Sequence, residues 1–300
     1  MVNTMYIGEI AALLTAFCWV GSSVSFEFSG KQVGSLVLNL MRLVISLVVI
    51  TVINFFITSG FQNLTVSPEA FQALLISGFV GLVIGDLFLF QAFVEIGARI
   101  SMLIMALAPP ITAVLSYFLL DETLGFFQIL GMAVTILGIA VVILGKDKRA
   151  QKIVVKHPLK GILFAFLGAV GQALGLILSK VGVAELNPFV ASEIRIFSGI
   201  LGFMVILTFT RKWPSFFKAF KNKTAMVGIT VGSLFGPVVG VSLSLMAVKY
   251  TSTAIASTLM AIVPILIIPV SIFIFKEKVK ANEIIGALIG VLGVAIIFIG

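Results

Sequence analysis

Apolar residues run almost without interruption along this chain, and short polar or glycine-containing segments divide them into ten stretches. Each stretch is long enough to cross a bilayer core of roughly 30 Å as a helix. Barrel strands would instead alternate polar and apolar positions over about ten residues. The pattern therefore predicts ten transmembrane helices, near 5–27, 33–57, 70–93, 98–119, 124–144, 159–180, 188–210, 224–247, 253–275 and 281–299.

The same set of spaced residues occurs twice in the chain, 155 residues apart. From Pro109, and again from Pro264, a glutamate follows at +13 and glycines follow at +22 and +29. Arg42 and Arg195 match at an offset of 153, earlier in each copy. Duplicated halves in a membrane-spanning chain are typical of transporters. The predicted units are a first repeat at 1–145, a basic connector at 146–157 and a second repeat at 158–300.

Five helices per repeat is an odd number, so the second copy must enter the membrane from the opposite side. The predicted fold is therefore all-α, with two inverted five-helix repeats. Of the 20 Lys and Arg residues, 16 lie in loops on one side, whereas the loops of the other side hold only Lys180 and Lys249. Because basic loops stay in the cytoplasm, we expect a multi-pass protein of the cell membrane with both termini outside.

Composition narrows the class of protein. The chain is 60% hydrophobic and 11% charged, whereas soluble domains carry about 25% charged residues. The net charge of +8 is read as a topology signal and not as a nucleic-acid footprint. Cys18 and His157 are the only residues of their kinds, and the phosphate-binding, zinc-protease and hydrolase motifs are absent. We therefore expect no catalytic residues, no metal site, no cofactor and no nucleic-acid partner.

The repeated Pro-x12-Glu-x8-Gly-x6-Gly pattern, in five-helix copies, resembles the EamA domain of the drug/metabolite transporter superfamily. Both copies match and cover nearly the whole chain, and Arg42 and Arg195 resemble a position that is commonly Arg in that family. The resemblance implies a secondary transporter that exports amino acids or other small polar metabolites. It also implies cytoplasmic termini, the opposite of the orientation that the Lys and Arg distribution favours.

Asp86 lies deep in the third predicted span, within GLVIGDLFLFQ, and its equivalent in the second repeat is Val241. A carboxylate facing lipid at that depth would cost several kcal/mol, so we expect it to face the interior of the bundle. No residue of its own span offers a cation. It is a candidate for proton coupling or for binding a substrate amine. The alternative is a structural carboxylate, paired with an Arg or kept protonated by burial.

Five further polar or aromatic residues are candidates to line a binding cavity. Arg42 and Arg195 lie inside predicted spans and could bind a substrate carboxylate through two hydrogen bonds. Their presence in both copies favours a structural role. Trp19, Gln91 and Gln172 could add polar groups to an apolar cavity, although Trp19 could equally be a packing residue.

Two duplicated positions suggest features of the helices themselves. Pro109 and Pro264 interrupt their spans and could act as hinges or as fixed kinks. Glu122 and Glu277 follow these spans, where a carboxylate at the start of the next helix is favoured by the helix dipole. We expect both glutamates to cap helices.

The function that these features favour is secondary transport, as an exporter of small polar metabolites such as amino acids, by alternating access. Proton coupling is one option for its energy source. A membrane channel and a lipid- or drug-handling protein of the same fold are the alternatives, and a membrane enzyme is less favoured. The partners expected are a small polar metabolite and membrane lipid. Because one chain carries both repeats, a monomer could be complete.

Overall fold

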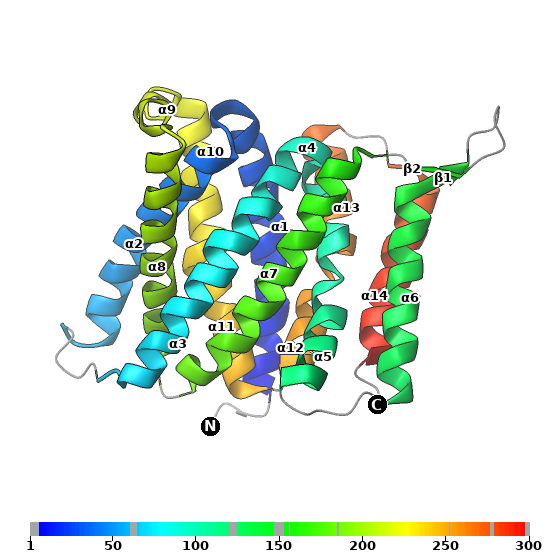
Figure 1. Cartoon of the computed structure of the whole chain (residues 1–300), viewed down its shortest axis with the longest axis horizontal. Helices are drawn as coiled ribbons and strands as arrows, with labels where there is room; N and C mark the ends of the chain where they lie inside the picture. The colour runs from blue at the N-terminus through cyan, green and yellow to red at the C-terminus, as the bar shows by residue number, and fades with distance from the viewer. Residues whose placement is uncertain are drawn as a thin grey trace.

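The computed structural model describes residues 6–60, 65–119, 125–146, 153–155, 157–184, 186–251, 253–276 and 279–297. Within these ranges the chain is almost entirely helical, and its long helices stand side by side in a bundle (Figure 1). Glu122 and Glu277, which we expect to cap helices, lie outside the described residues.

The two halves of the chain contain similar series of helices, joined by a small antiparallel strand pair. The first half consists of α1 (Ile7–Val33), α2 (Ser35–Ile57), α3 (Pro68–Gly78), the π-helix η2 (Phe79–Gly85), α4 (Asp86–Met105), α5 (Ala108–Leu119) and α6 (Phe126–Ile143). The strands are β1 (Leu144–Lys146) and β2 (Ile153–Val155). The second half consists of α7 (Leu159–Val183), α8 (Pro188–Phe209), α9 (Trp213–Ala219), α10 (Lys223–Ser233), the π-helix η3 (Leu234–Gly240), α11 (Val241–Tyr250), α12 (Thr253–Met260), α13 (Val263–Phe275) and α14 (Ala281–Ile297).

Among the described residues, seven helices are long and apolar enough to cross a membrane, and 263–274 and 281–297 form shorter apolar helices. Two predicted spans are not single helices. The span predicted at 98–119 is divided, since 98–105 belongs to α4 and α5 begins at Ala108. The span predicted at 253–275 is likewise divided between α12 and α13. In both places a proline stands in the first turn of the second piece, where its missing N–H leaves no helical bond unmade.

Helix boundaries repeat between the halves at the offset seen in the sequence. The π-helices η2 and η3 start at Phe79 and Leu234, which are 155 residues apart. The same offset relates the starts of α3 and α10, of α5 and α13, and of α6 and α14. The seven-residue helix α9 has no counterpart in the first half among the described residues, and hydropathy did not predict it.

The first helix of each half packs against the third helical segment of the other half. On α7, a Cβ added at Gly171 would lie 2.5 Å from the Cα of Gly85, and one at Gly175 would lie 2.8 Å from the Cα of Gly81. Such close backbone approach requires glycine. On the other side, a Cβ at Gly236 would lie 3.2 Å from the Cβ of Ser22 on α1. The two halves therefore interlock around a shared centre.

Helices α6 and α14 form a close pair at one side of the bundle (Figure 1). A Cβ added at Gly138 would lie 2.4 Å from the backbone nitrogen of Gly290, so the two backbones touch. The outer side chains Phe126, Leu137 and Leu292 are exposed, which suits a surface that faces lipid. The repeated glycines of the sequence pattern thus serve helix packing.

Candidate functional site

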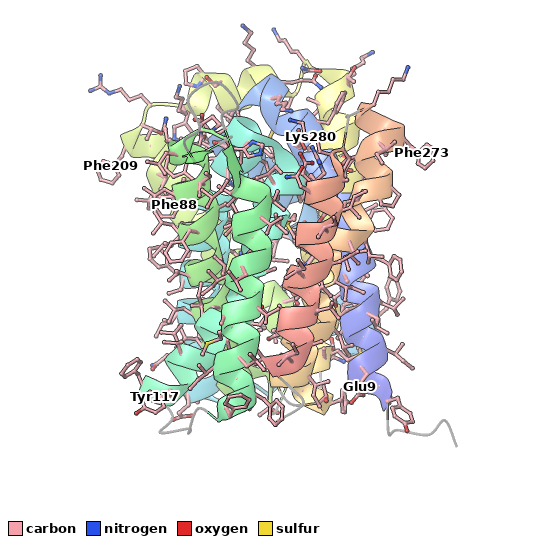
Figure 2. The ribbon with its side chains drawn as sticks, turned by 90° about the vertical axis from the view of Figure 1, so that its right-hand side faces the viewer. Glu9, Phe88, Tyr117, Phe209, Phe273 and Lys280 are labelled. Carbon is pink, nitrogen blue, oxygen red and sulfur yellow. The ribbon has the colours of Figure 1, made fainter. Side chains whose placement is uncertain are left out.

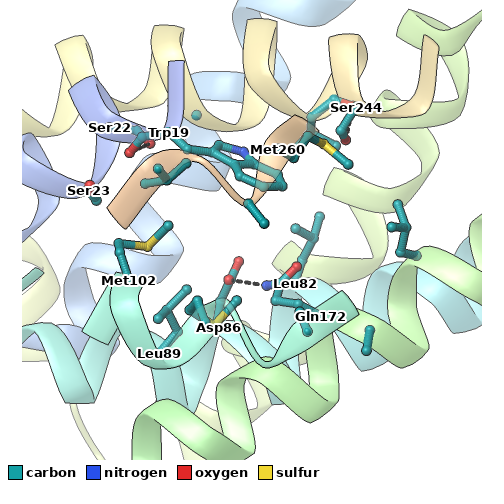
Figure 3. Close-up of a pocket in the computed structure, with 18 of the residues that line it drawn as sticks. Trp19, Ser22, Ser23, Leu82, Asp86, Leu89, Met102, Gln172, Ser244 and Met260 are labelled. Carbon is teal, nitrogen blue, oxygen red and sulfur yellow. Dashed lines mark hydrogen bonds between the residues drawn. The ribbon is translucent and has the colours of Figure 1, made fainter. Parts of the chain in front are cut away.

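A cavity lies at the centre of the bundle and is lined by segments of both halves, from α1 through α13. The cavity volume is about 150 Å³, which is room for on the order of ten water molecules. Trp19 of α1 faces Asp86 and Gln172 across this space (Figure 3). The walls of the cavity are mainly apolar with a few polar groups, as in many small-molecule sites.

Most of the candidates from the sequence meet at this cavity. The residues that line it are Trp19, Arg42, Asp86, Gln172 and Arg195, together with Pro109 and Pro264. Gln91 does not line it. Its amide instead accepts from Ser35 Oγ at 2.6 Å and donates to Glu95 at 2.9 Å. Five residues along a helix turn the side chain by roughly 140°, so Gln91 points away from the face that carries Asp86.

Asp86 begins α4, directly after η2, and each of its carboxylate oxygens accepts a hydrogen bond from the protein. Arg42 Nη2 donates to its Oδ2 in an ion pair, and Gln172 Nε2 donates to its Oδ1 at 2.6 Å (Figure 3 shows the second bond). Asn39 donates to the Asp86 backbone carbonyl at 3.3 Å and accepts from Arg42 Nε at 2.9 Å. The cation that its own span lacks therefore comes from α2. This geometry matches the structural alternative for Asp86, although the carboxylate also borders the cavity.

Aromatic rings hold the Arg42 guanidinium in place. Its Cζ lies 4.5 Å from the centroid of Phe90 and 5.7 Å from that of Phe26. A cation over an aromatic face is attracted by the ring quadrupole. Arg42 is therefore fixed by an acid, an amide and two rings, and only 3% of its surface is exposed.

Arg195 is equally buried but has a different environment. It occupies the equivalent position on α8, and 3% of it is exposed. Its Nε has no hydrogen-bond partner among the described residues. Its Nη2 would lie 3.0 Å from a Cβ added at Gly81, so the glycine makes room for the guanidinium. The position that carries Asp86 in the first repeat carries Val241 in the second, and Val241 also lines the cavity.

The lining residues come in equivalent pairs from the two copies. Trp19 and Gln172 are related by the offset of 153, as are Arg42 and Arg195. At the offset of 155, the lining pairs include Met105 with Met260, Leu89 with Ser244, Met102 with Ser257, and Pro109 with Pro264. The cavity therefore lies where the two repeats meet, and the pairs that differ make it asymmetric.

Sequence reasoning missed the hydroxyl side chains and the phenylalanines of the lining. These are Ser22, Ser23, Thr112, Ser244 and Ser257, with Phe26, Phe90 and Phe93. Serines in apolar spans are common, and hydropathy alone does not distinguish those that face a cavity. Applying the repeat offset to Asp86 and Pro109 and then examining their helix neighbours would have selected several of them.

Breaks in two helices border the cavity at equivalent places. Ala106 and Leu107 separate α4 from α5, and Ala261 and Ile262, 155 residues later, separate α12 from α13. Ala106 and Ala261 line the cavity next to Pro109 and Pro264. The breaks come just before the prolines. That Pro109 and Pro264 act as hinges stays a prediction.

A second buried carboxylate, Glu27, stabilises a kink near the end of the bundle that carries Lys280. Gly97 has φ 80°, which interrupts α4, and the helix restarts at Ala98. The Ala98 N–H donates to Glu27 Oε2 at 2.7 Å, and Lys31 forms an ion pair with the same carboxylate. A carboxylate at a helix start is favoured by the unpaired N–H groups there. Figure 2 shows the two ends of the bundle: Lys280 marks the end near this kink, and Glu9 marks the opposite end.

Comparison with known proteins finds one family model that matches both halves of the chain and two relatives that match part of it. The model of the EamA-like transporter family matches residues 6–144 and 159–299. Over 178 residues, 59% of this chain, the sequence is 29% identical to an "Uncharacterized transporter" of Clostridium kluyveri. Over 206 residues, 68% of this chain, it is 25% identical to "Uncharacterized transporter YetK" of Bacillus subtilis. The aligned segments span 56% and 60% of these relatives, less than two thirds of either.

A solved crystal structure superposes on the chain with a TM-score of 0.64, covering 99% of this chain and 96% of that one. The two sequences are 16% identical, so this match speaks for the fold alone. The family match, in contrast, covers both copies of the repeat. With its several apolar helices, the chain is a multi-pass membrane protein. It belongs to the EamA-like transporter family.

Proposed function

We propose that the chain is a secondary transporter that carries a small polar metabolite by alternating access between two inverted five-helix repeats. The observation that carries the proposal is the central cavity, which both copies line with equivalent residues and which contains buried ionisable groups. Transporters built from inverted repeats bind their substrates at the interface of the repeats, near discontinuous helices.

Helix boundaries support five crossings per repeat. We count α1, α2, the segment 68–96, the broken segment 98–119 and α6 as the first five. The second five are α7, α8, the segment 223–250, the broken segment 253–275 and α14. An odd number of crossings places the two copies in opposite directions. Paired breaks beside the cavity would allow each repeat to tilt one half of a helix while the rest stays packed.

The distribution of Lys and Arg residues supports a proposal for how the chain is oriented in the membrane. We propose that the protein spans the cell membrane with the basic loops in the cytoplasm and both termini outside, as the Lys and Arg bias indicates. Export of the metabolite is the direction that the family resemblance favours. This orientation is independent of the cavity and has its own test below.

A lipid- or drug-handling protein is the second candidate, and one observation favours it. Trp19, Phe26, Phe90 and Phe93 give the cavity large aromatic walls that would suit a hydrophobic cargo. Buried arginines, however, have a high desolvation cost that an entirely apolar cargo would not offset. We therefore place the small polar metabolite first.

The proposal is tested by a thermal-shift screen of the purified protein against amino acids, nucleosides and organic acids, followed by uptake into vesicles. The Ala261→Phe variant should narrow the cavity and abolish both the shift and the uptake. The matched control Ala281→Phe changes an exposed residue at the start of α14 and should leave both intact. Shifts and uptake that persist in Ala261→Phe would place the ligand elsewhere and contradict the proposal.

A further inference from the structure

The two copies of the repeat differ at one pair of positions in a way that changes the charge of the cavity. In the first copy Arg42 and Asp86 form a buried ion pair. In the second copy Arg195 is present but the acid is replaced by Val241. Among the described residues that line the cavity, the ionisable ones are these two arginines and Asp86. The site therefore carries one uncompensated positive charge.

A guanidinium in such a place is costly without an anion. Arg195 is 97% buried, and its Nε has no partner among the described residues. Removing a charged group from water costs several kcal/mol unless it is paired and hydrogen-bonded. Asp86 attracts Arg195 electrostatically as well as pairing with Arg42, but one carboxylate neutralises the charge of only one guanidinium. A second anion in the cavity would neutralise the remaining positive charge.

We infer that Arg195 is a binding site for the carboxylate of the transported molecule, which supplies the anion that Val241 does not. A carboxylate matches the planar fork of a guanidinium and forms two parallel hydrogen bonds with it. Binding of a carboxylate at Arg195 does not depend on the proposed function. Only the statement that this carboxylate is the transported molecule rests on it.

The other residues that line the cavity indicate which chemical groups the rest of the ligand should carry. Opposite the polar floor formed by Asp86 and Gln172 lies the ring of Trp19, with Met102 and Met260 nearby (Figure 3). Because Asp86 is engaged by Arg42, no described acid in the lining is free to receive an ammonium group. The favoured class is therefore a small monocarboxylate with an apolar body, such as a branched or aromatic short-chain acid. A zwitterionic amino acid of the same shape should bind less tightly.

The test measures binding to the purified full chain with matched pairs of probes. Phenylacetate and 4-methylpentanoate are compared with their amides, which keep the shape and lose the charge, and with leucine. We expect both carboxylates to raise the melting temperature and to bind at least tenfold more tightly than the amides and leucine. Equal binding of carboxylates and amides, stabilisation by chloride equal to that by the carboxylates, or no stabilisation by either carboxylate would overturn the inference.

Variants locate the site. Arg195→Gln should weaken carboxylate binding at least tenfold, and Arg195→Lys, which keeps the charge without the fork, should have an intermediate effect. Val241→Asp adds an acid to the cavity lining at the position equivalent to Asp86. It should therefore weaken carboxylate binding at least tenfold more than Val241→Asn, whose side chain has nearly the same size. Carboxylate binding that is unchanged in Arg195→Gln, or equal in Val241→Asp and Val241→Asn, would refute the assignment. If Arg195→Gln does not fold, the comparison at Val241 decides.

Failure of this inference can be told apart from failure of transport. Carboxylate binding without any flux in vesicles would leave the Arg195 site standing and contradict the proposed function. Flux of an amine or a neutral compound, without carboxylate binding, would leave transport standing and contradict the Arg195 site.

Discussion

The Arg42 guanidinium donates to the Asp86 carboxylate, and both side chains are buried where the cavity meets α2 and α4. Removing one partner of such a pair leaves the other charge buried and costs about 3–5 kcal/mol. Asp86→Asn should therefore lower the stability of the purified protein by about this amount. Thermal unfolding in detergent measures it, and a variant as stable as the unmodified protein would contradict the pairing.

A double variant separates the structural role of Asp86 from a role in transport. Arg42→Gln combined with Asp86→Asn removes both charges, so it should be more stable than Asp86→Asn alone, as in a double-mutant cycle of an interacting pair. If Asp86 also serves transport, flux in vesicles stays lost when stability returns. Recovery of flux together with stability would make Asp86 a structural residue.

Glu27 should stabilise the restart of α4 at Ala98. Glu27→Ala removes the acceptor and leaves a buried N–H without it, at a cost of about 1–3 kcal/mol. Glu27→Gln keeps an acceptor oxygen and should cost less. The control is Lys31→Met, because the Lys31 side chain is half exposed and such pairs contribute about 0–1 kcal/mol. A larger loss of melting temperature in Lys31→Met than in Glu27→Ala would show that the ion pair matters more than the cap.

The sequence was enough to predict the helical membrane fold, and most of the candidate residues chosen from it do line the cavity, because charged and polar residues stand out in apolar spans. Trp19, Gln172 and the two arginines stand out as polar or amphipathic residues within apolar spans, and the two arginines also fall at equivalent positions of the repeat. The pairing of Asp86 with Arg42 joins two helices, and no spacing along one span contains it. Gln91 was misplaced for a related reason, since polarity alone does not say which face of a helix meets the cavity.

Hydropathy also overestimated the length of single helices at 98–119 and 253–275. Breaks at 106–107 and 261–262 lie inside continuous apolar sequence, where a window average remains high. The prolines marked both places, but their effect is on the residues just before them. The bond from Ala98 to Glu27 joins two helices far apart in the sequence, and the seven-residue helix α9 is too short for a hydropathy window to resolve.

Close contact between α6 and α14 predicts a strong effect of adding one methyl group. Gly138→Ala would place a Cβ 2.4 Å from the backbone nitrogen of Gly290, so the helices must separate, at a cost of about 1–3 kcal/mol. Gly21→Ala is the matched control, because a Cβ there meets the Phe235 ring at an ordinary 3.5 Å. Thermal unfolding of the two variants should differ clearly. Equal melting temperatures would show that the α6–α14 contact is looser than described.

The proposed orientation is tested with single cysteines in a Cys18→Ser background. Ser215 is exposed on the short helix α9, within the basic segment between α8 and α10. Glu69 is exposed in the first turn of α3, at the opposite end of the bundle (Figure 1). In intact cells an impermeant maleimide should label Glu69→Cys and not Ser215→Cys, and permeabilisation should expose the latter. The reverse pattern would establish cytoplasmic termini.

The central claim is that the cavity carries a solute across the membrane by alternating access, and counterflow tests it most directly. Proteoliposomes are loaded with an unlabelled carboxylate that binds the purified protein and are diluted into a trace of the same compound in labelled form. A carrier whose site faces each side in turn should accumulate the label transiently above its outside concentration, and Ala261→Phe should abolish the overshoot. Equilibration of the label without any overshoot would indicate a channel, and the absence of protein-dependent entry would contradict transport of that compound altogether.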